Sequence, residues 1–511
     1  MDFKQFFHHP SFTLADTSSA RAVGVTSLWL IGLAWFTKIL YNIYLHPLAK
    51  YPGSKLYAAS SIPLAIAQLR GRWHLFVQAA HEKYGPVVRL GPSELSYISA
   101  PAWNDIYARR GVKAPLPRDR TFFNDMLVDP GSITMADDTN HGRIRRSLAP
   151  AFSQKALLEQ ESIIQGNVDL LLDQLQKRAQ QGLASDLRAW NNYATFDLIG
   201  DLAFGDTFGC LKTSEFHEWV KMVLDYFYVA TLLQVVHRFR PLNRLLVMML
   251  PASLVEEKEK HTRMALEKVR TRTSTTVERS DFIHYMQKAV ELGSITNHEL
   301  ENQASILILA GSETTSIALT YAIYFLITHQ DTMRKLRAEL TRNFQNERDI
   351  TLITVNQLEY LQAVLQETLR MRPPITNGFP RQTPKEGAII DGQFVPGTTV
   401  VNISHWAAYQ SSANFLYPDQ FRPERWTGDK QFDGDSKDCF QPFSVGPRNC
   451  IGKKFAYDSM KLILARMLWR FDVALEGDVS KGGKNDTWVS GHDSFVSWNV
   501  PPLNISLTPR Q

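Results

Sequence analysis

The residues best suited to chemistry form one short segment, Phe443-Ser-Val-Gly-Pro-Arg-Asn-Cys-Ile-Gly452. Cys450 stands directly ahead of an apolar-periodic stretch, residues 453–470, which predicts a helix. A thiol at a helix N-terminus lies at the positive end of the backbone dipole, and a cation such as Arg448 also favours the thiolate. Two glycines permit a tight turn and close approach of a flat group. The segment predicts a thiolate metal ligand, although an isolated free cysteine is more often a small buried hydrophobe.

This segment resembles a known signature. The haem-binding pattern F-x-x-G-x-R-x-C-x-G of the cytochrome P450 family is matched by Phe443, Gly446, Arg448, Cys450 and Gly452. The likeness runs from about residue 44 to the C-terminus, and further motifs of the family accompany the first. It implies a b-type haem with Cys450 as the axial ligand of the iron.

Two other segments resemble the part of the family that stabilises the core beside the haem. Glu367-Thr-Leu-Arg370 is similar to the family's E-x-x-R, and a spacing of three puts both side chains on one helix face. Alone, such a pair is usually a solvated surface pair. Phe421-Arg-Pro-Glu-Arg425-Trp follows at a spacing like that of the family. The resemblance implies that Glu367, Arg370 and Arg425 form one buried cluster, which needs all its partners.

Residues 310–315, Ala-Gly-Ser-Glu-Thr-Thr, resemble the distal helix of the family. The resemblance places Ala310 and Gly311 against the haem, and Gly311 would let the helix loosen locally. It gives Thr314 and Glu313 the role of relaying protons to dioxygen at the iron. A threonine in the middle of a helix otherwise bonds back to the carbonyl four residues earlier.

The run His141-Gly-Arg143-Ile-Arg145-Arg146 falls where family members carry W-x-x-x-R. His141 replaces the tryptophan and Arg145 the arginine, and the resemblance implies that both donate to a haem propionate. Arg381, which follows Gly-Phe-Pro, resembles the arginine that takes another propionate. Which of the three clustered arginines points inward stays open, and a basic surface for an acidic redox partner is the alternative for Arg143 and Arg146.

The elements that must position these residues are mainly helices. Apolar residues three and four apart predict helices over 73–84, 154–178, 197–203, 252–271, 299–329, 331–344 and 357–370, with Thr296-x-x-Glu299 as a capping box. Short strands are predicted over 87–90, 95–98, 388–390, 398–401 and 504–507. A mainly α fold with a small β region results, in agreement with the triangular prism of the family.

Composition limits the class of protein. Apolar residues at 44% and charged residues at 21% are globular values, and a net charge of +5 is too small and dispersed to indicate nucleic-acid binding. No linker divides the 511 residues, so one large catalytic domain, residues 46–511, is expected. Three cysteines without metal-ligand spacing give no support for zinc or a disulfide framework, and Cys210 and Cys439 are interpreted as packing residues.

The N-terminal region predicts a membrane anchor. After a lead of residues 1–21, residues 22–45 are mostly apolar and long enough to cross a hydrocarbon core of about 30 Å. No small-residue cleavage site follows, so a signal peptide is disfavoured. Basic residues are more frequent after the segment than before it, which predicts a single pass with the catalytic domain facing the cytoplasm, as in the endoplasmic reticulum.

The resemblance implies a monooxygenase that uses dioxygen and two electrons from NADPH, delivered by NADPH-cytochrome P450 reductase, to oxidise a lipophilic small molecule. Similarity to members from filamentous fungi indicates a secondary-metabolite substrate; terpenoid, polyketide and alkaloid are not ranked, nor is hydroxylation separated from epoxidation, desaturation, ring closure or coupling. Expected substrate contacts come from residues 120–129, with Phe122, Phe123 and Met126, from Gln303, Ile306, Leu307 and Ala310, and from residues 375–379. For each apolar one, core packing is the alternative.

Two other functions are the alternatives to a monooxygenase. One is a P450 isomerase or dehydratase that works without a reductase, and Glu313 with Thr314 argues against it because such an enzyme needs no oxygen-activating pair. The other is a non-catalytic haem-thiolate sensor, which has no use for a proton relay. Dependence on NADPH separates both from the monooxygenase.

Overall fold

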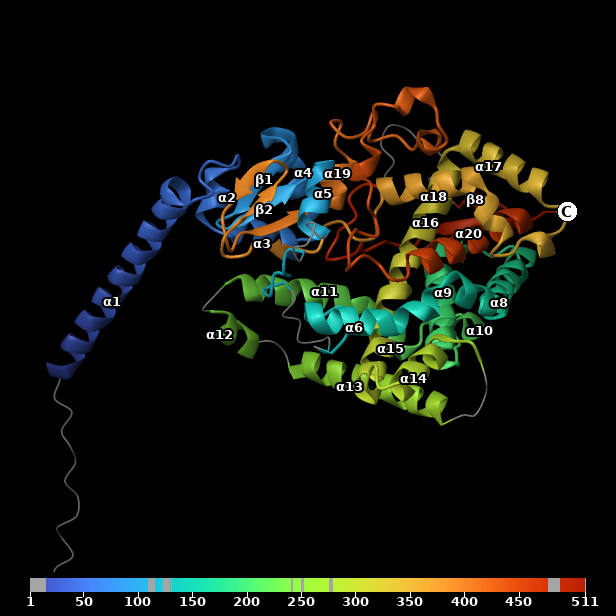
Figure 1. The fold of residues 1–511 in the computed structure, drawn as a ribbon, viewed down its shortest axis with the longest axis horizontal. Helices are drawn as coiled ribbons and strands as arrows, with labels where there is room; N and C mark the ends of the chain where they lie inside the picture. The colour runs from blue at the N-terminus through green and yellow to red at the C-terminus, as the bar shows by residue number, and fades with distance from the viewer. Residues whose placement is uncertain are drawn as a thin grey trace, which may run out of the picture.

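The structure is a computed structural model that describes residues 15–108, 115–122, 129, 131–239, 242–249, 252–274, 279–476 and 488–510. Helices make up most of the body, and a small β region lies toward the side from which the N-terminal helix α1 (Ala15–Leu40) extends (Figure 1). The expected fold class, mainly α with a small β region, is confirmed. Phe123 and Met126, two expected substrate contacts, lie outside the described residues.

The helices of the N-terminal half are α2 (Lys55–Ala59), α3 (Ile62–Leu69), α4 (Trp73–Tyr84), α5 (Ala100–Tyr107), α6 (Asp138–Leu148), α7 (Gln154–Glu159), α8 (Glu161–Gln180), α9 (Leu187–Phe204), α10 (Cys210–Thr213) and α11 (Glu218–Arg238). Those that follow are α12 (Asn243–Met248), α13 (Ala252–Thr273), α14 (Phe282–Glu291), α15 (Asn297–Gly311), α16 (Glu313–Thr328), α17 (Gln330–Asn343), α18 (Glu359–Met371), α19 (His405–Tyr409) and α20 (Lys453–Arg470). Short 3₁₀ turns are η2 (Ala149–Phe152), η3 (Glu347–Asp349), η4 (Thr354–Gln357), η5 (Pro423–Trp426), η6 (Lys430–Phe432) and η7 (Lys437–Cys439).

The strands form three small sheets. They are β1 (Val87–Gly91), β2 (Glu94–Tyr97), β3 (Ser185–Asp186), β4 (Arg381–Gln382), β5 (Ala388–Ile390), β6 (Gln393–Val395), β7 (Val400–Ile403), β8 (Phe471–Leu475) and β9 (Asn504–Pro509). The largest has the order β1-β2-β7-β4, in which β2 and β7 run parallel and the other pairs are antiparallel. This sheet brings Arg381, at the start of β4, next to segments that are far away in sequence.

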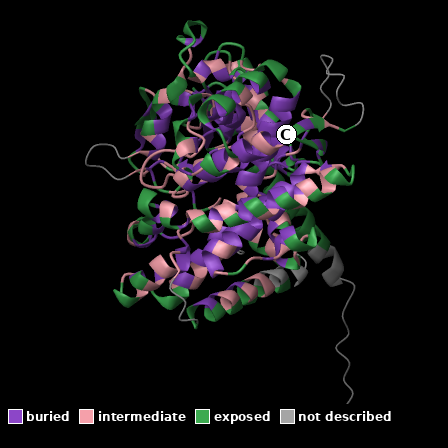
Figure 2. Ribbon diagram, turned by 90° about the vertical axis from the view of Figure 1, so that its right-hand side faces the viewer, coloured by how far each residue is buried: buried purple, intermediate pink, exposed green. Residues whose placement is uncertain are grey.

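Helices α15 and α16 run through the middle of the protein (Figure 1), and most residues of α16 are buried. Buried residues gather in the interior, and exposed residues lie on the outer faces of the helices (Figure 2). The capping box of Thr296 and Glu299 is confirmed, since each side chain binds the backbone of the other. The expectation of one continuous helix over 299–329 is wrong, because the helix is interrupted at Ser312. The expected helix over 154–178 is likewise divided, into α7 and α8.

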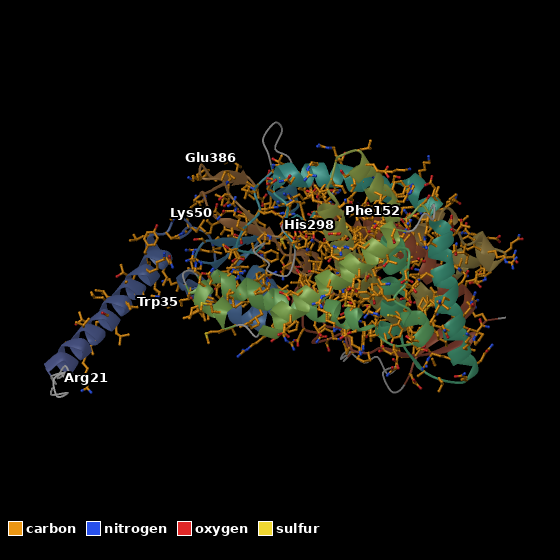
Figure 3. The ribbon with its side chains drawn as sticks, turned by 90° about the horizontal axis from the view of Figure 1, so that it is seen from below. Arg21, Trp35, Lys50, Phe152, His298 and Glu386 are labelled. Carbon is orange, nitrogen blue, oxygen red and sulfur yellow. The ribbon has the colours of Figure 1, made fainter. Side chains whose placement is uncertain are left out.

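The N-terminal helix is the exposed candidate membrane span. Among the described residues, three helical segments are long and apolar enough to cross a membrane, namely Arg21–Leu45, Glu218–Arg238 and Asn297–Thr328. The apolar windows of the last two are 50% and 83% buried in the protein, whereas that of the first is 0% buried. Trp35 is one of its exposed aromatic side chains (Figure 3). The second and third segments are therefore explained by packing in the protein.

The N-terminal helix continues directly into the body of the protein. The π-helical turn η1 (Tyr41–Leu45) continues α1, and the Asn42 side-chain amide on this turn is buried and donates a hydrogen bond to the Ala59 carbonyl at 3.2 Å. The next turn is closed by the backbone N–H of His46, which donates to the Tyr41 carbonyl at 2.8 Å. The helix is thus fixed to the domain by hydrogen bonds.

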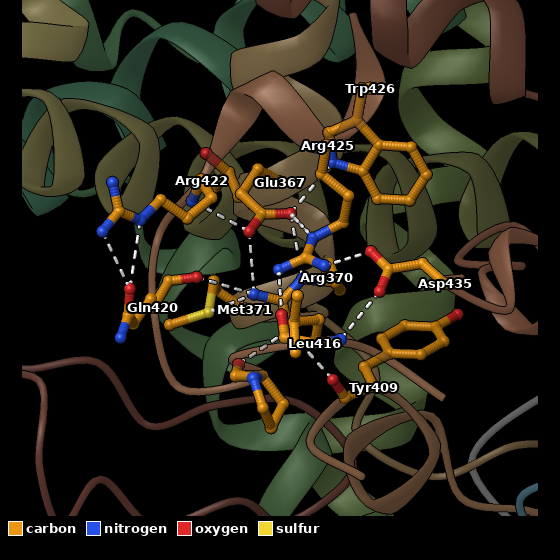
Figure 4. A network of polar contacts seen from close by, with 12 residues as sticks. Glu367, Arg370, Met371, Tyr409, Leu416, Gln420, Arg422, Arg425, Trp426 and Asp435 are labelled. Carbon is orange, nitrogen blue, oxygen red and sulfur yellow. Dashed lines mark hydrogen bonds and ion pairs between the residues drawn. The ribbon is translucent and has the colours of Figure 1, made fainter. Parts of the chain in front are cut away.

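A buried charged cluster joins α18 to the segment that follows α19 (Figure 4). Arg370 donates two hydrogen bonds to the Glu367 carboxylate at 2.8 and 2.9 Å, and Arg425 Nε lies 3.4 Å from the same carboxylate. Arg425 also pairs with Asp435, which the sequence analysis did not anticipate. The side chains of Glu367, Arg370 and Arg425 are 0% exposed, so each charge depends on the others for compensation.

The same guanidinium groups hold the backbone of the segment. Arg370 donates to the carbonyls of Tyr409, Pro418 and Gln420 at 2.7–3.0 Å, and Arg425 donates to the Leu416 carbonyl at 2.8 Å. The Tyr409 hydroxyl in turn accepts the backbone N–H of Gln441 at 2.9 Å. The cluster therefore fixes the path of the chain that leads to the cysteine segment 443–452.

We predict that Glu367→Gln lowers the free energy of unfolding by about 3 kcal/mol or more, because it leaves buried guanidinium charge uncompensated. Glu424→Gln is the matched control, since Glu424 lies on η5 beside Arg425 but pairs with the exposed Lys335. It should cost less than about 1 kcal/mol. Urea unfolding followed by circular dichroism gives both values. Equal losses in the two variants would contradict the structural role of Glu367.

Candidate active site

Segment 443–452 forms a compact loop that presents Cys450 at the N-terminus of α20. The backbone N–H of Cys450 donates to the Phe443 carbonyl at 2.9 Å, and that of Asn449 donates to the Gly446 carbonyl at 3.1 Å. Gly446 has φ +78°, and a Cβ there would lie 2.2 Å from the Tyr107 carbonyl oxygen. Only glycine fits this position.

The Cys450 thiol is accessible although it lies deep in the protein. The residue is exposed, while desolvation by the surrounding protein raises the pKa of its thiol. The thiol therefore borders an internal space. The N–H of Gly452 and the charges of Arg145 and Lys453 oppose this rise of the pKa but do not outweigh it. The protein alone thus favours the thiol, contrary to the expectation from the helix dipole, and binding of a cation would supply the missing stabilisation of the thiolate.

The cations that act on Cys450 are Arg145 and Lys453, and Arg448 is not one of them. Arg145 donates to the carbonyl and to the side-chain oxygen of Asn449, both at 2.6 Å. Arg143 points to the other side of α6 and pairs with Glu299, while Arg146 is exposed. Among the three clustered arginines, Arg145 is therefore the one that reaches the cysteine loop.

Further cationic groups gather next to Arg145. Arg448 donates to Asp138 at 2.7 and 2.9 Å and to the Ala136 carbonyl at 2.8 Å. Burial, followed by the charge of Arg448, lowers the pKa of His141 to about 3, so its imidazole is neutral. Burial also lowers the pKa of Arg381 to about 10, with Arg448 as a further repulsive charge. His141, Arg145, Arg381 and Arg448 are thus brought to one region.

Arg118 is a member of this cationic group that the sequence analysis missed. It forms an isolated antiparallel bridge with Arg381 and donates to the Thr134 carbonyl. Burial and the charges of Arg448 and Arg381 lower the pKa of Arg118 to about 9. No motif surrounds this arginine, and only its pairing with the strand of Arg381 brings it to the site.

The second part of the predicted site lies where α15 ends at Gly311 and α16 begins at Glu313. A Cβ on Gly311 would lie 2.8 Å from Ile199 Cδ1, so a larger residue would force the Ile199 side chain of α9 to move. Ala310 is exposed although its neighbours on α15 are mostly buried, and Thr314 is half-buried. Helix α16, which begins here, packs against α20, the helix that follows Cys450.

Thr314 and Glu313 have separate partners. The Thr314 hydroxyl donates to the Ala310 carbonyl at 2.9 Å, the local bond that competes with an external role. Glu313 is buried and pairs with Arg188 of α9, which also donates to the Ser316 hydroxyl at 3.0 Å. Burial raises the pKa of Glu313 despite this partner, and its Oε2 has no hydrogen-bond partner among the described residues.

The expected substrate contacts have mixed environments. Ile306 and Leu307 are almost fully buried on α15, and Phe122 meets Phe379 edge-on with ring centroids 6.1 Å apart. Gln303 has a structural task instead, because its side chain accepts the N–H of Ile133 at 2.7 Å and donates to the Gly131 carbonyl at 2.9 Å. It fastens the loop before α6 to α15.

The donor set fits a haem. An accessible thiol and a cationic region match the iron and the two carboxylates of that cofactor. Within the part of the chain that the structure describes, Arg448 Nη1 and Arg381 Nε are buried without a hydrogen-bond partner. Buried donors of this kind are normally satisfied, so they indicate acceptor atoms supplied by a bound group.

Comparison with known proteins agrees with this site. The sequence model of the cytochrome P450 family matches residues 60–496. The chain is 58% identical to cytochrome P450 monooxygenase astD of Aspergillus oryzae, over 96% of this chain and 95% of the relative. It is 39% identical to cytochrome P450 monooxygenase cpaH of Aspergillus oryzae, over 97% and 96%. It is 37% identical to trichothecene C-15 hydroxylase of Fusarium sporotrichioides, over 94% and 97%.

These likenesses extend over nearly the whole chain, and the matched range 60–496 spans the segments that hold the cysteine loop, the buried Glu-Arg-Arg cluster and the interrupted helix. The family model alone covers far more than half of the sequence. The protein is therefore a member of the cytochrome P450 family and acts as a monooxygenase.

Proposed function

We propose that this monooxygenase holds the haem iron through Cys450 and hydroxylates a lipophilic small molecule of fungal secondary metabolism. Electrons come from NADPH through a membrane-bound cytochrome P450 reductase. The observation that carries the proposal is the accessible Cys450 thiol beside a region of buried cationic groups with unsatisfied donors. The relative named as a trichothecene C-15 hydroxylase supports hydroxylation as the reaction.

The chain's own residues would hold the cofactor from three directions. Cys450 binds the iron, and Arg145 stabilises the thiolate from α6. Arg381 and Arg448 have the unsatisfied donors that propionate carboxylates would accept, with His141 and Arg118 beside them. When bound, haem supplies the activation of dioxygen, which no amino-acid side chain can provide.

Thr314 and Glu313 are proposed to transfer protons next to Ala310. The Thr314 oxygen keeps lone pairs free while it donates to the Ala310 carbonyl, so it can accept a hydrogen bond from water. The Glu313 carboxylate has an unpaired Oε2 and a raised pKa, which suits a group that takes up and releases a proton. Arg188 holds this carboxylate in one orientation.

The membrane location is also part of the proposal. The exposed helix of residues 21–45 would span the membrane of the endoplasmic reticulum, with the catalytic domain in the cytoplasm. Leu245, Met248 and Met249 are exposed on or next to α12, which offers a second apolar contact with the bilayer. A lipophilic substrate would reach the enzyme from that phase.

We predict that membranes with the intact protein, reduced and exposed to carbon monoxide, show the strongly red-shifted Soret band of thiolate-ligated haem. Cys450→Ser should abolish the band, because the thiolate is lost. Cys439→Ser is the control, since that residue is buried eleven positions earlier and should leave the band intact. A band that persists in Cys450→Ser would overturn the assignment of the ligand. Substrate oxidation must also depend on NADPH.

Arg145→Gln should release haem faster than the wild type, because it removes the cation beside Cys450. A hydrogen bond to a charged group contributes about 1.5–3 kcal/mol, so a release rate raised by about tenfold to a hundredfold is expected. Arg146→Gln, the exposed neighbour, should leave the rate unchanged. Transfer of haem to apomyoglobin measures both rates, and equal rates would contradict the assignment.

Removal of residues 2–40 should make the protein extractable from membranes by alkaline carbonate, because no spanning segment remains. Asn42 is kept in this variant so that its bond to Ala59 still closes the domain. The carbon monoxide band of the truncated protein checks that it is folded. Resistance to carbonate after truncation would show that another segment holds the protein in the bilayer.

A further inference from the structure

A cavity of about 210 Å³ lies between α11, α13 and α15. Its walls are largely apolar, with Val223 and Val229 from α11, Ala265 from α13, and Ile306 and Leu309 from α15. His261 and Ser305 also line it, from α13 and α15. Most of the cavity surface is therefore apolar, although polar and charged side chains also line it, and a mainly apolar surface with polar groups is typical of a site for a small molecule.

A chain of hydrogen bonds fixes the polar groups of this wall. The indole N–H of Trp219, on α11, donates to His261 Nδ1 at 2.6 Å. Indole nitrogen is only a donor, so Nδ1 of His261 must be the accepting nitrogen. Burial lowers the pKa of His261 to about 4, so the imidazole is neutral and its proton is on Nε2. That proton is therefore donated to the Ser305 hydroxyl, 2.7 Å away.

The direction of these hydrogen bonds determines whether the Ser305 hydroxyl can act as a donor. Its oxygen accepts from His261, which leaves the hydroxyl proton for another partner. Many serines and threonines of this protein donate to the carbonyl four residues earlier, as Thr314 does, but Ser305 makes no such bond within the described residues. Ser305 thus presents a donor on the wall of an apolar cavity.

We propose that this cavity holds the oxygen-bearing end of the substrate and that Ser305 donates a hydrogen bond to a neutral carbonyl, ether or hydroxyl oxygen. His261 and Trp219 are positioning residues that keep Ser305 a donor. The inference rests on the proposed function, since it assigns a substrate class to the monooxygenase: a lipophilic molecule with an acceptor oxygen.

The charges around the cavity select a neutral acceptor over an anionic one. Asp129, Asp225 and Glu301 also line it, and the only cationic candidate among its lining residues within the described chain is the exposed His298. His298 lies 3.6 Å from Asp129 and 3.8 Å from Glu301, so its charge is already engaged by carboxylates when it is protonated. A substrate carboxylate would be repelled here.

The position of Ser305 also relates the bound oxygen to the reaction site. Ser305 precedes Ala310 by five residues on the same helix, which is roughly 7.5 Å along the axis at about 1.5 Å per residue. Five residues also turn the helix by about 140°, so Ser305 and Ala310 lie on different faces of α15. Ile306, which lines the cavity, precedes Ala310 by four residues and shares its face, and it thereby connects the cavity wall to the exposed Ala310.

Matched imidazole probes test the inference, because imidazole nitrogen binds haem iron and shifts the Soret band in a titration. The probes carry a phenyl or biphenyl spacer that ends in an acetyl, ethyl or carboxylate group. With at least one spacer, the wild type should bind the acetyl probe about threefold to tenfold more tightly than the ethyl probe, the range of one neutral hydrogen bond. The carboxylate probe should bind more weakly than either.

Ser305→Ala should remove the preference for acetyl and leave the Kd of the ethyl probe unchanged, whereas Ser305→Thr should keep the preference. His261→Phe as a single substitution should reduce the preference for the acetyl probe. Added to Ser305→Ala, it should cause no further change in that preference, because the two residues belong to one series of hydrogen bonds. No preference in the wild type with either spacer, or a preference that survives Ser305→Ala, overturns the inference. The carbon monoxide band of the same preparation separates this failure from a loss of thiolate-ligated haem, which would remove both proposals.

Discussion

The compensation of charge around Glu367 is the constraint on which the catalytic architecture depends. Its carboxylate and the guanidinium groups of Arg370 and Arg425 have no access to water, so any rearrangement that separates them leaves a buried charge unpaired. The backbone carbonyls that share these guanidinium groups belong to the segment after α19. The position of the Cys450 loop is consequently set from a distance, by ions that would never touch the haem.

The two sides of the site differ in how they are built. The loop that holds Cys450 is rigid for steric reasons, since Gly446 lies against the backbone of Tyr107. The other part, which carries the residues predicted for the distal side, is a helix that is interrupted at Ser312, between α15 and α16. Such breaks occur where a helix must admit another group, and here the break adjoins the exposed Ala310. A rigid loop that holds the ligand Cys450 and an interrupted helix suit a cofactor that is bound on one face and accessible on the other.

Many of the helices and several site residues could be predicted from the sequence because they depend on local residue patterns. Helix α20 and the capping box of Glu299 follow from periodicity and from a pair of residues three apart. Other features depend on contacts that have no local pattern. Arg118 reaches the cationic region through a bridge with Arg381, and Asp435 completes the charged cluster from a loop. The lowered pKa that the sequence predicts for Cys450 is wrong for the same reason, since the desolvation that raises it depends on the whole fold.

The bond between Asn42 and Ala59 has a consequence for how the enzyme meets its partners. A flexible tether would let the domain turn freely above the bilayer, whereas a helix that continues into the domain passes its own tilt on to that domain. In the proposed membrane location, encounters with a reductase would then occur by diffusion in two dimensions between molecules that already share an orientation. The search would be reduced to lateral motion and rotation about one axis, so fewer collisions would be needed for each productive electron transfer.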